Sequence, residues 1–257
     1  MRSFNASSSN AELLDLVMGA TDAASQLLAT LGAQKNVMTG VREGQYSIDV
    51  VTDNAIREVF TSAGVAVFSE ESGFDEVVWP LSGDALVAVV DPLDGSTNAD
   101  RGIPWYSTSI ALIDAVGLRI GVVKNQANGD VYVASRGEGA TRNGMPIRVA
   151  QPRALAQSVV GVSAMPDKEI GWWQFRALGS AALDLCLVAS RGLDAWVDFG
   201  SHGMWDYAAG MLIVQEAGGA VDEVFGRGPM HADYDPRRTI VAASTGELLQ
   251  KLVQARK

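Results

Sequence analysis

The sequence predicts an α+β fold of layered sheets and helices rather than a regular doubly wound sheet. The predicted strands come in runs of several, and the predicted helices lie between those runs. The chain has 257 residues, which is enough for one large domain or two closely joined halves. With 47% hydrophobic residues and charges of both signs, its composition is that of a globular protein and not of a disordered one.

Two helices are expected near the N-terminus. Ser9 and Glu12 form a capping-box pattern, after which apolar residues recur at helical spacing up to Leu31. These residues form one apolar stripe, which is typical of a helix with a single buried face. Residues 45–62 predict a loop or strand that leads into a second helix at 54–62.

A run of strands follows the second helix. The short apolar segments 64–68 and 85–90 predict buried strands. Alternating strands separated by turn signals then extend from residue 107 to 149. Within that region, the dipeptides Asn128-Gly129 and Asn143-Gly144 are typical of hairpin turns.

The chain crosses to a second half near residues 151–153, so we expect an N-terminal half, 1–152, and a C-terminal half, 153–257. The helix at 205–219 is apolar almost all round and should be buried. The elements expected in the C-terminal half are, in chain order, a strand at 158–165, a helix at 180–190, a strand at 193–199, the helix at 205–219, a strand at 239–244 and a helix at 245–256.

Charge and composition argue against several classes of protein. The net charge of −10 and the lack of a Lys/Arg cluster argue against a surface that binds nucleic acid. No apolar run approaches the roughly 20 residues that span a bilayer. The first ten residues lack the apolar core of a signal peptide, so we expect a soluble cytoplasmic protein. Cys186, the single cysteine, lies in an apolar helical stretch and is expected to be inert core packing.

Acidic residues follow two of the buried strands directly, and one more opens the helix at 205–219. If the two strands are neighbours in one sheet, their ends meet and the carboxylates converge. Like charges gathered in a partly dry site repel one another, so they need a cation or protons. Carboxylates without Cys or His select a hard ion, Mg²⁺, Mn²⁺ or Ca²⁺, over zinc. The five candidates are Glu70, Glu71, Asp91, Asp94 and Asp206.

Several of these acids also have a structural interpretation. Asp206 alone is typical of an N-terminal helix cap, and the "EES" at 70–72 of a solvated loop. The residues after Asp94 add a second signal, because a Gly-Ser-Thr turn before a short helix presents free N–H groups to an anion. Carboxylates that bind metal beside a site for phosphate predict phosphoryl transfer to water.

Three segments resemble motifs of the inositol monophosphatase family, which are Mg²⁺-dependent, lithium-sensitive phosphatases. They are "FSEES" (68–72), "DPLDGSTN" (91–98) and "WDYAAGMLIVQEAGG" (205–219), and the similarity extends from about Asp49 to the last strand. The resemblance implies a five-layer α-β-α-β-α sandwich with the site between its two halves. It also implies a homodimer.

The resemblance assigns metal ligands by position. Glu70, Asp91 and the carbonyl of Leu93 would hold a first Mg²⁺. Asp91, Asp94 and Asp206 would hold a second.

The same resemblance assigns the groups around phosphate. The N–H groups of Gly95, Ser96 and Thr97 would bind phosphate oxygens. Ser96 and Glu70 would orient the attacking water, with the carboxylate of Asp49 behind the Ser96 hydroxyl. Ser96 stands where the family more often has threonine, a change that keeps the hydroxyl.

Two parts of the pattern leave alternatives open. Either Asp49 or Asp53 could be the acid behind the hydroxyl, and we favour Asp49. Asp198 could accept hydrogen bonds from a polyol or be an exposed acid at a strand end. His202 and His231 are expected to be surface or loop residues. The positions where family members contact the leaving group are Arg176, Ser180, Ala181 and Asp198.

The sequence therefore predicts a Mg²⁺-dependent phosphomonoesterase for a small phosphorylated metabolite, most simply inositol 1-phosphate. Relatives of the same fold that act on fructose 1,6-bisphosphate, histidinol phosphate or adenosine 3′,5′-bisphosphate are the nearest alternatives. A further alternative is a protein of this fold that binds a transcription or ribosome-assembly partner.

Overall fold

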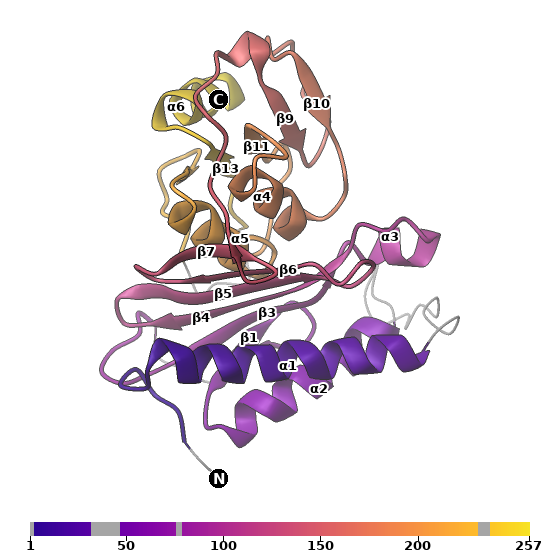
Figure 1. Ribbon diagram of the computed structural model, residues 1–257, viewed down its shortest axis with the longest axis vertical. Helices are drawn as coiled ribbons and strands as arrows, with labels where there is room; N and C mark the ends of the chain where they lie inside the picture. The colour runs from indigo at the N-terminus through magenta and orange to yellow at the C-terminus, as the bar shows by residue number, and fades with distance from the viewer. Residues whose placement is uncertain (1–2, 32–46, 76–78, 231–236) are drawn as a thin grey trace.

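The computed structural model describes residues 3–31, 47–75, 79–230 and 237–257. Figure 1 shows the elements stacked in layers along the long axis of the molecule. Helices α1 and α2 form one end, the large sheet lies on them, and α4 and α5 separate it from a second sheet that α6 covers at the other end. The expected α-β-α-β-α order is confirmed.

The large sheet has eight strands in the order β2-β1-β3-β4-β5-β6-β7-β8. Strands β1 and β3 are parallel, and every other neighbouring pair is antiparallel. The strands are β1 (Ala66–Ser69), β2 (Gly73–Phe74), β3 (Val87–Asp94), β4 (Ser107–Asp114), β5 (Gly117–Asn125), β6 (Val131–Ser135), β7 (Gly139–Arg142) and β8 (Met145–Pro146).

The outer face of this sheet is covered by α1 (Asn10–Leu31) and α2 (Ser47–Ser62). The predicted capping box is confirmed, since the backbone N–H of Ser9 donates to Glu12 Oε2 at 2.9 Å and that of Glu12 to Ser9 Oγ at 3.3 Å. The loop or strand expected before residue 54 is wrong for residues 47–53, which are helical. The pattern misled because this turn buries polar side chains, Asp49 and Asp53 among them, where a helix facing a core usually carries apolar ones.

The second sheet has five strands in the order β10-β9-β11-β13-β12. It contains strands from the predicted segments at 158–165, 193–199 and 239–244, each shorter than expected. The remaining elements are α3 (Ser96–Arg101), a 3₁₀ turn (Leu155–Gln157), β9 (Val159–Val162), β10 (Gln174–Arg176), α4 (Ala181–Ala189), β11 (Ala195–Val197), α5 (Met204–Glu216), β12 (Ala220–Glu223), β13 (Ile240–Ala243) and α6 (Gly246–Arg256).

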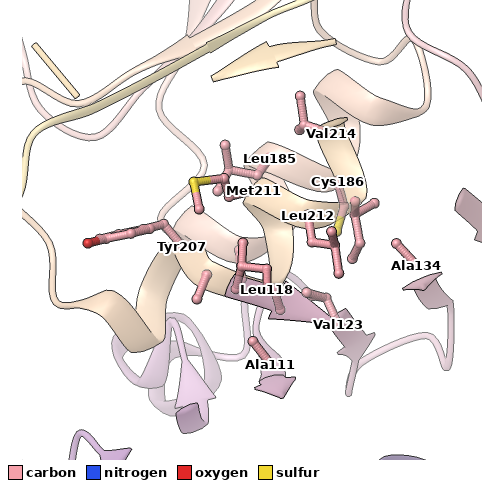
Figure 2. Packing of buried hydrophobic residues seen from close by; sticks show 14 of the residues in the cluster. Ala111, Leu118, Val123, Ala134, Leu185, Cys186, Tyr207, Met211, Leu212 and Val214 are labelled. Atoms are coloured by element: carbon pink, nitrogen blue, oxygen red, sulfur yellow. The ribbon is translucent and has the colours of Figure 1, made fainter. Parts of the chain in front are cut away.

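Helix α5 lies between the two sheets, and its first eleven residues are all buried, as its apolar sequence predicts. Figure 2 shows side chains of α4 and α5, Cys186 and Leu212 among them, facing Val123 and Ala134 of the large sheet. The helix approaches the sheet closely, because a Cβ added to Gly121 would lie 2.8 Å from the carbonyl oxygen of Ala209. Burial raises the pKa of Cys186 well above its usual value, which favours inert packing.

The sheets change over between Pro146, where β8 ends, and Val159, where β9 begins. The boundary at 152/153 falls in that interval and stays a prediction. Within the described ranges, no helix is long and apolar enough to cross a membrane. The cytoplasmic location also stays a prediction.

Candidate active site

The ends of β1 and β3 lie side by side, as the sequence predicts for neighbouring buried strands. The two strands pair in parallel with Ser69 opposite Val90, and the N–H of Glu70 donates to the Val90 carbonyl at 3.1 Å. This register places Glu70 beside Asp91, the first acid of the second strand. Two carboxylates that are 21 positions apart in the sequence therefore meet at one edge of the sheet.

The start of α5 brings a third acid to the same place. Asp206 lies in the first turn of the helix, and its Oδ2 accepts a hydrogen bond from the Gly203 N–H at 2.8 Å. Ser109 lies opposite Asp91 in β4 and donates its hydroxyl to the carbonyl of Trp205 at 3.1 Å, which ties the helix start to the sheet. The N-cap of α5 is Gly203, so the interpretation of Asp206 as the cap residue is wrong; Asp206 is the third residue of the helix, and its carboxylate accepts the N–H of the cap residue while also facing the other acids.

Three carboxylates form a compact cluster. Glu70, Asp91 and Asp206 each offer an oxygen atom, and these atoms all lie within 4.8 Å of one another. Asp91 and Asp206 are buried, and Glu70 is partly exposed. Glu71 lies next to the cluster but is not one of its three members.

Asp94 completes the group from the end of β3. It is only 8% exposed, and its Oδ2 accepts hydrogen bonds from Ser180 Oγ at 2.6 Å and from the Ala182 N–H at 2.8 Å. The β3–β4 pairing shifts between Asp91 and Asp94, so the strand is irregular where the two acids lie. The Leu93 N–H donates to Asp91 Oδ1 at 2.9 Å, and the role of the Leu93 carbonyl as a ligand stays a prediction.

The acids perturb one another strongly. Burial is the main cause that raises the pKa of Glu70 and of Asp91 well above their usual values, and the neighbouring carboxylates raise both further. Burial and the charge of Asp206 raise the pKa of Asp94 to about 7, and burial raises that of Asp206. Negative charges held this close in a buried site require protons or a cation for balance.

A divalent cation fits this donor set. The four acids supply only carboxylate oxygens, and no Cys or His belongs to the three-acid cluster among the described residues. Such a set suits Mg²⁺, Mn²⁺ or Ca²⁺ rather than zinc, and a bound cation would relieve the repulsion that raises the pKa values. The residues therefore fit a hard divalent cation of the kind that the sequence predicts.

The predicted phosphate-binding residues lie directly after β3. Gly95 precedes α3 with φ +86°, a conformation that favours glycine, and Ser96 and Thr97 begin the helix. Asn98 Nδ2 donates to the carbonyls of Trp105 at 2.7 Å and Leu178 at 2.8 Å, so α3 is fastened to the segment that leads into α4. Binding of phosphate by this turn stays a prediction.

Helix α2 brings the two alternative acids to the same end of the sheet. Asp49 and Asp53 are 4% and 2% exposed and lie one turn apart. Asp53 Oδ1 accepts the hydroxyl of Ser69 at 2.5 Å, so Asp53 has a defined partner at the end of β1. The role of Asp49 as the acid behind Ser96, the alternative preferred from the sequence, stays a prediction.

Asp198 differs from one of its two expectations. It is fully buried and is therefore not an exposed acid at a strand end. Its Oδ1 accepts from Ser163 Oγ at 2.7 Å and from the Gly200 N–H at 2.8 Å, and its Oδ2 lies 2.9 Å from His202 Nδ1. The interaction with Asp198 outweighs the effect of burial and raises the pKa of His202 to about 9. Contact between Asp198 and a substrate stays a prediction.

Two arginines lie in different surroundings. Arg176 is exposed in β10 and donates to the Phe175 carbonyl and to Gln174 Oε1, each at 2.7 Å, so its contact with substrate stays a prediction. Sequence reasoning missed Arg237, whose guanidinium lies 5.5 Å from the centre of the Trp205 ring. Burial raises the pKa of Asp206, and the charge of Arg237 offsets part of that rise. His231 lies outside the described residues.

The match to known proteins covers nearly the whole chain. The profile of the inositol monophosphatase family matches residues 9–257. The chain belongs to the inositol monophosphatase family. Its relatives include a Nus factor SuhB from Pasteurella multocida, 36% identical over 68% of this chain and 70% of the relative. A fructose-1,6-bisphosphatase/inositol-1-monophosphatase from Archaeoglobus fulgidus is 37% identical over 76% of this chain and 77% of the relative.

Solved structures agree with the family assignment. An IMPase from Thermotoga maritima superposes with a TM-score of 0.80 and 26% identity, covering 95% of this chain and 96% of that one. Membership of the inositol monophosphatase family makes the chain a phosphoric monoester hydrolase. The carboxylate cluster and the predicted phosphate-binding turn therefore lie in a phosphatase of this family.

Sequence reasoning missed the partners of the site acids. The two donors to Asp94 are Ser180 and the Ala182 N–H, which lie 86 and 88 residues further along the chain. A serine before an apolar helical run signals a helix cap, which Ser180 is, but no sequence pattern reports which carboxylate the hydroxyl reaches. The contact between Asp53 and Ser69 has no sequence signal either, because the pattern of residues 47–53 does not indicate a helix.

Proposed function

We propose that this phosphatase hydrolyses a small polyol phosphate, with inositol 1-phosphate as the first substrate to test, and that it requires Mg²⁺. The observation that carries the proposal is the convergence of Glu70, Asp91 and Asp206 within 4.8 Å from segments far apart in the sequence. Asp94 lies at the end of the same strand as Asp91. Together the four carboxylates would hold the cation beside the turn that begins at Gly95.

Each group of the site would have a separate role in phosphate hydrolysis. When bound, Mg²⁺ would neutralise phosphate oxygens, activate water and stabilise the departing alkoxide. The N–H groups of Gly95, Ser96 and Thr97 would bind and orient the phosphate. Ser96 and Glu70 would orient the attacking water, with the buried carboxylate of Asp49 behind the Ser96 hydroxyl.

Phosphate release measured with and without Mg²⁺ tests this proposal. Asp94→Asn and Asp206→Asn should lower kcat/KM by at least about 100-fold, because a bound metal contributes several kcal/mol to transition-state stabilisation. Asp222→Asn is the matched control, since Asp222 is an exposed acid in β12 and should change kcat/KM little. Equal rates in Mg²⁺ and in EDTA would rule the proposal out.

The substrate is a separate question from the chemistry. The Archaeoglobus fulgidus relative is named for both fructose 1,6-bisphosphate and inositol 1-phosphate, so fructose 1,6-bisphosphate is the strongest alternative. A comparison of kcat/KM for these two compounds, histidinol phosphate and adenosine 3′,5′-bisphosphate would rank the candidates. We expect inositol 1-phosphate to be first, and a tenfold preference for another compound would replace it.

A partner-binding role is the second candidate, because the Pasteurella multocida relative is named a Nus factor. If transcription-partner binding is the main role, capture of RNA polymerase should persist in the Asp94→Asn variant and in EDTA. The family also supports a homodimer, for which light scattering should give about twice the chain mass of 27.1 kDa.

A further inference from the structure

We propose that Ser180 is a positioning residue that orients Asp94 for the catalytic cation. The inference rests on the proposed function for the role of Asp94 as a ligand. It departs from the expectation that residue 180 contacts the leaving group, because its side chain is buried and directed at a carboxylate. Ser180 is 1% exposed, and its hydroxyl lies 2.6 Å from Asp94 Oδ2.

Both donors to Asp94 reach the same oxygen atom. Ser180 Oγ donates to Oδ2 at 2.6 Å, and the Ala182 N–H donates to it at 2.8 Å. A carboxylate held through one oxygen by two donors has a fixed plane, so its other oxygen, Oδ1, points in a defined direction. Oδ1 is therefore the atom that would face the cation, and the two hydrogen bonds to Oδ2 determine its orientation.

The hydroxyl proton of Ser180 has a defined direction as well. Ser180 is the N-cap of α4, and its Oγ accepts a hydrogen bond from the Leu183 N–H at 3.4 Å. Since one lone pair is used by that N–H, the hydroxyl proton is free to point at Asp94. The nearby Ser107 hydroxyl lies 3.4 Å away, further than the carboxylate oxygen.

This contact joins the two halves of the site. Asp94 ends β3 of the large sheet, whereas Ser180 begins α4, which packs between the sheets. The two residues are 86 positions apart. The same segment is held again by Asn98, whose side-chain N–H groups donate to the carbonyls of Trp105 and Leu178. The orientation of the Asp94 carboxylate thus depends on how α4 packs against the large sheet.

The test compares metal binding and catalysis in variants that lose the hydroxyl. Ser180→Ala and Ser180→Gly both remove the donor, and glycine keeps most of the preference for an N-cap position. Thr245→Ala is the matched control, because Thr245 caps α6, the helix that covers the second sheet, through the Leu248 N–H at 3.2 Å. Mn²⁺ binding, followed by electron paramagnetic resonance, reports on the site without catalysis.

We expect both Ser180 variants to weaken Mn²⁺ binding by about 10-fold and to raise the Mg²⁺ concentration for half-maximal activity by the same factor. This is the lower end of the range of effects seen when a metal-binding side chain loses its hydrogen-bond partner. Thr245→Ala should change either value by less than about 2-fold. The Asp94→Asn background provides a second check, because Ser180→Ala added to it should weaken Mn²⁺ binding by less than about 2-fold if the hydroxyl acts through Asp94.

Each outcome separates the two proposals. Folded Ser180 variants with wild-type Mn²⁺ affinity, or a full additional loss in the Asp94→Asn background, would overturn the positioning role and leave the proposed function intact. Wild-type protein that binds Mn²⁺ but releases phosphate from no ester in the panel would overturn the proposed function instead. Loss of Mn²⁺ binding in Thr245→Ala equal to that in Ser180→Ala would show a general effect of helix capping, and it too would overturn the role.

Discussion

Gly95 links the carboxylate cluster to the predicted phosphate-binding turn, and its replacement by alanine is the sharpest test of that geometry. Gly95 has φ +86°, and an added Cβ would lie 2.9 Å from the Gly179 carbonyl oxygen and 3.0 Å from that of Trp105. Both neighbours are backbone atoms. The side chain of Asn98 donates hydrogen bonds to the carbonyls of Trp105 and of Leu178, which precedes Gly179, and so holds both backbone segments in place. The backbone of the phosphate turn must therefore move.

The other end of the same helix offers a control. Gly102 follows α3 with φ +71°, and an added Cβ there has no atom within 4 Å. Gly102→Ala should cost only the left-handed strain of about 1–2 kcal/mol. Gly95→Ala has that strain plus about 1–3 kcal/mol for the forced contacts, so its free energy of unfolding should fall by about 2–5 kcal/mol.

Activity should separate the two variants further. A displacement of about 1 Å in a group that positions a substrate can lower the rate about 100-fold. We therefore expect Gly95→Ala to lose about 100-fold in kcat/KM and Gly102→Ala less than about 3-fold. Urea denaturation and phosphate release on the same preparations measure both quantities. Folded Gly95→Ala protein with nearly wild-type kcat/KM would refute the placement of phosphate at this turn.

Three further predictions concern stability and inhibition. Burial would raise the pKa of Asp114, but hydrogen bonds from Arg136 and backbone N–H groups outweigh it and lower that pKa. Asp114 therefore stabilises the fold above its unfolded pKa of about 3.9. Wild-type protein should lose stability more steeply than Asp114→Asn as the pH falls below about 4, and parallel urea midpoints would contradict this. Leu212 is 3% exposed between the sheets, so Leu212→Ala should lower the free energy of unfolding by about 2–5 kcal/mol, and a loss below 1 kcal/mol would argue against tight packing there. The family resemblance predicts that millimolar Li⁺ inhibits phosphate release, which a titration with Na⁺ as the control would check.

The sequence predicted the parts of the site that follow from local patterns. Solid apolar runs ending in acids indicated that Glu70 and Asp91 would meet if the strands paired, and β1 and β3 are parallel neighbours. The all-apolar helix that begins near Asp206 indicated a buried element, and α5 lies between the sheets. These inferences succeeded because strand burial and helix burial leave a periodic signal in the chain.

Other parts leave no such signal. Residues 47–53 form a helical turn whose buried positions include Asp49 and Asp53, and buried acids break the apolar pattern that identifies a helix face. The contact of Ser180 with Asp94 depends on how α4 docks, and docking is decided by packing across the whole interlayer core. The hydrogen-bonded surroundings of Asp198 likewise depend on Ser163, which lies 35 positions earlier in the chain just after β9.

A crystal structure with Mn²⁺ and phosphate tests the central claim most directly, because the anomalous signal of Mn²⁺ locates the ion independently of the protein. We expect a peak between Glu70, Asp91 and Asp206, within about 2.0–2.6 Å of their oxygens, and phosphate next to it at Gly95. Mn²⁺ bound elsewhere, with no ion between these three carboxylates, would contradict the account.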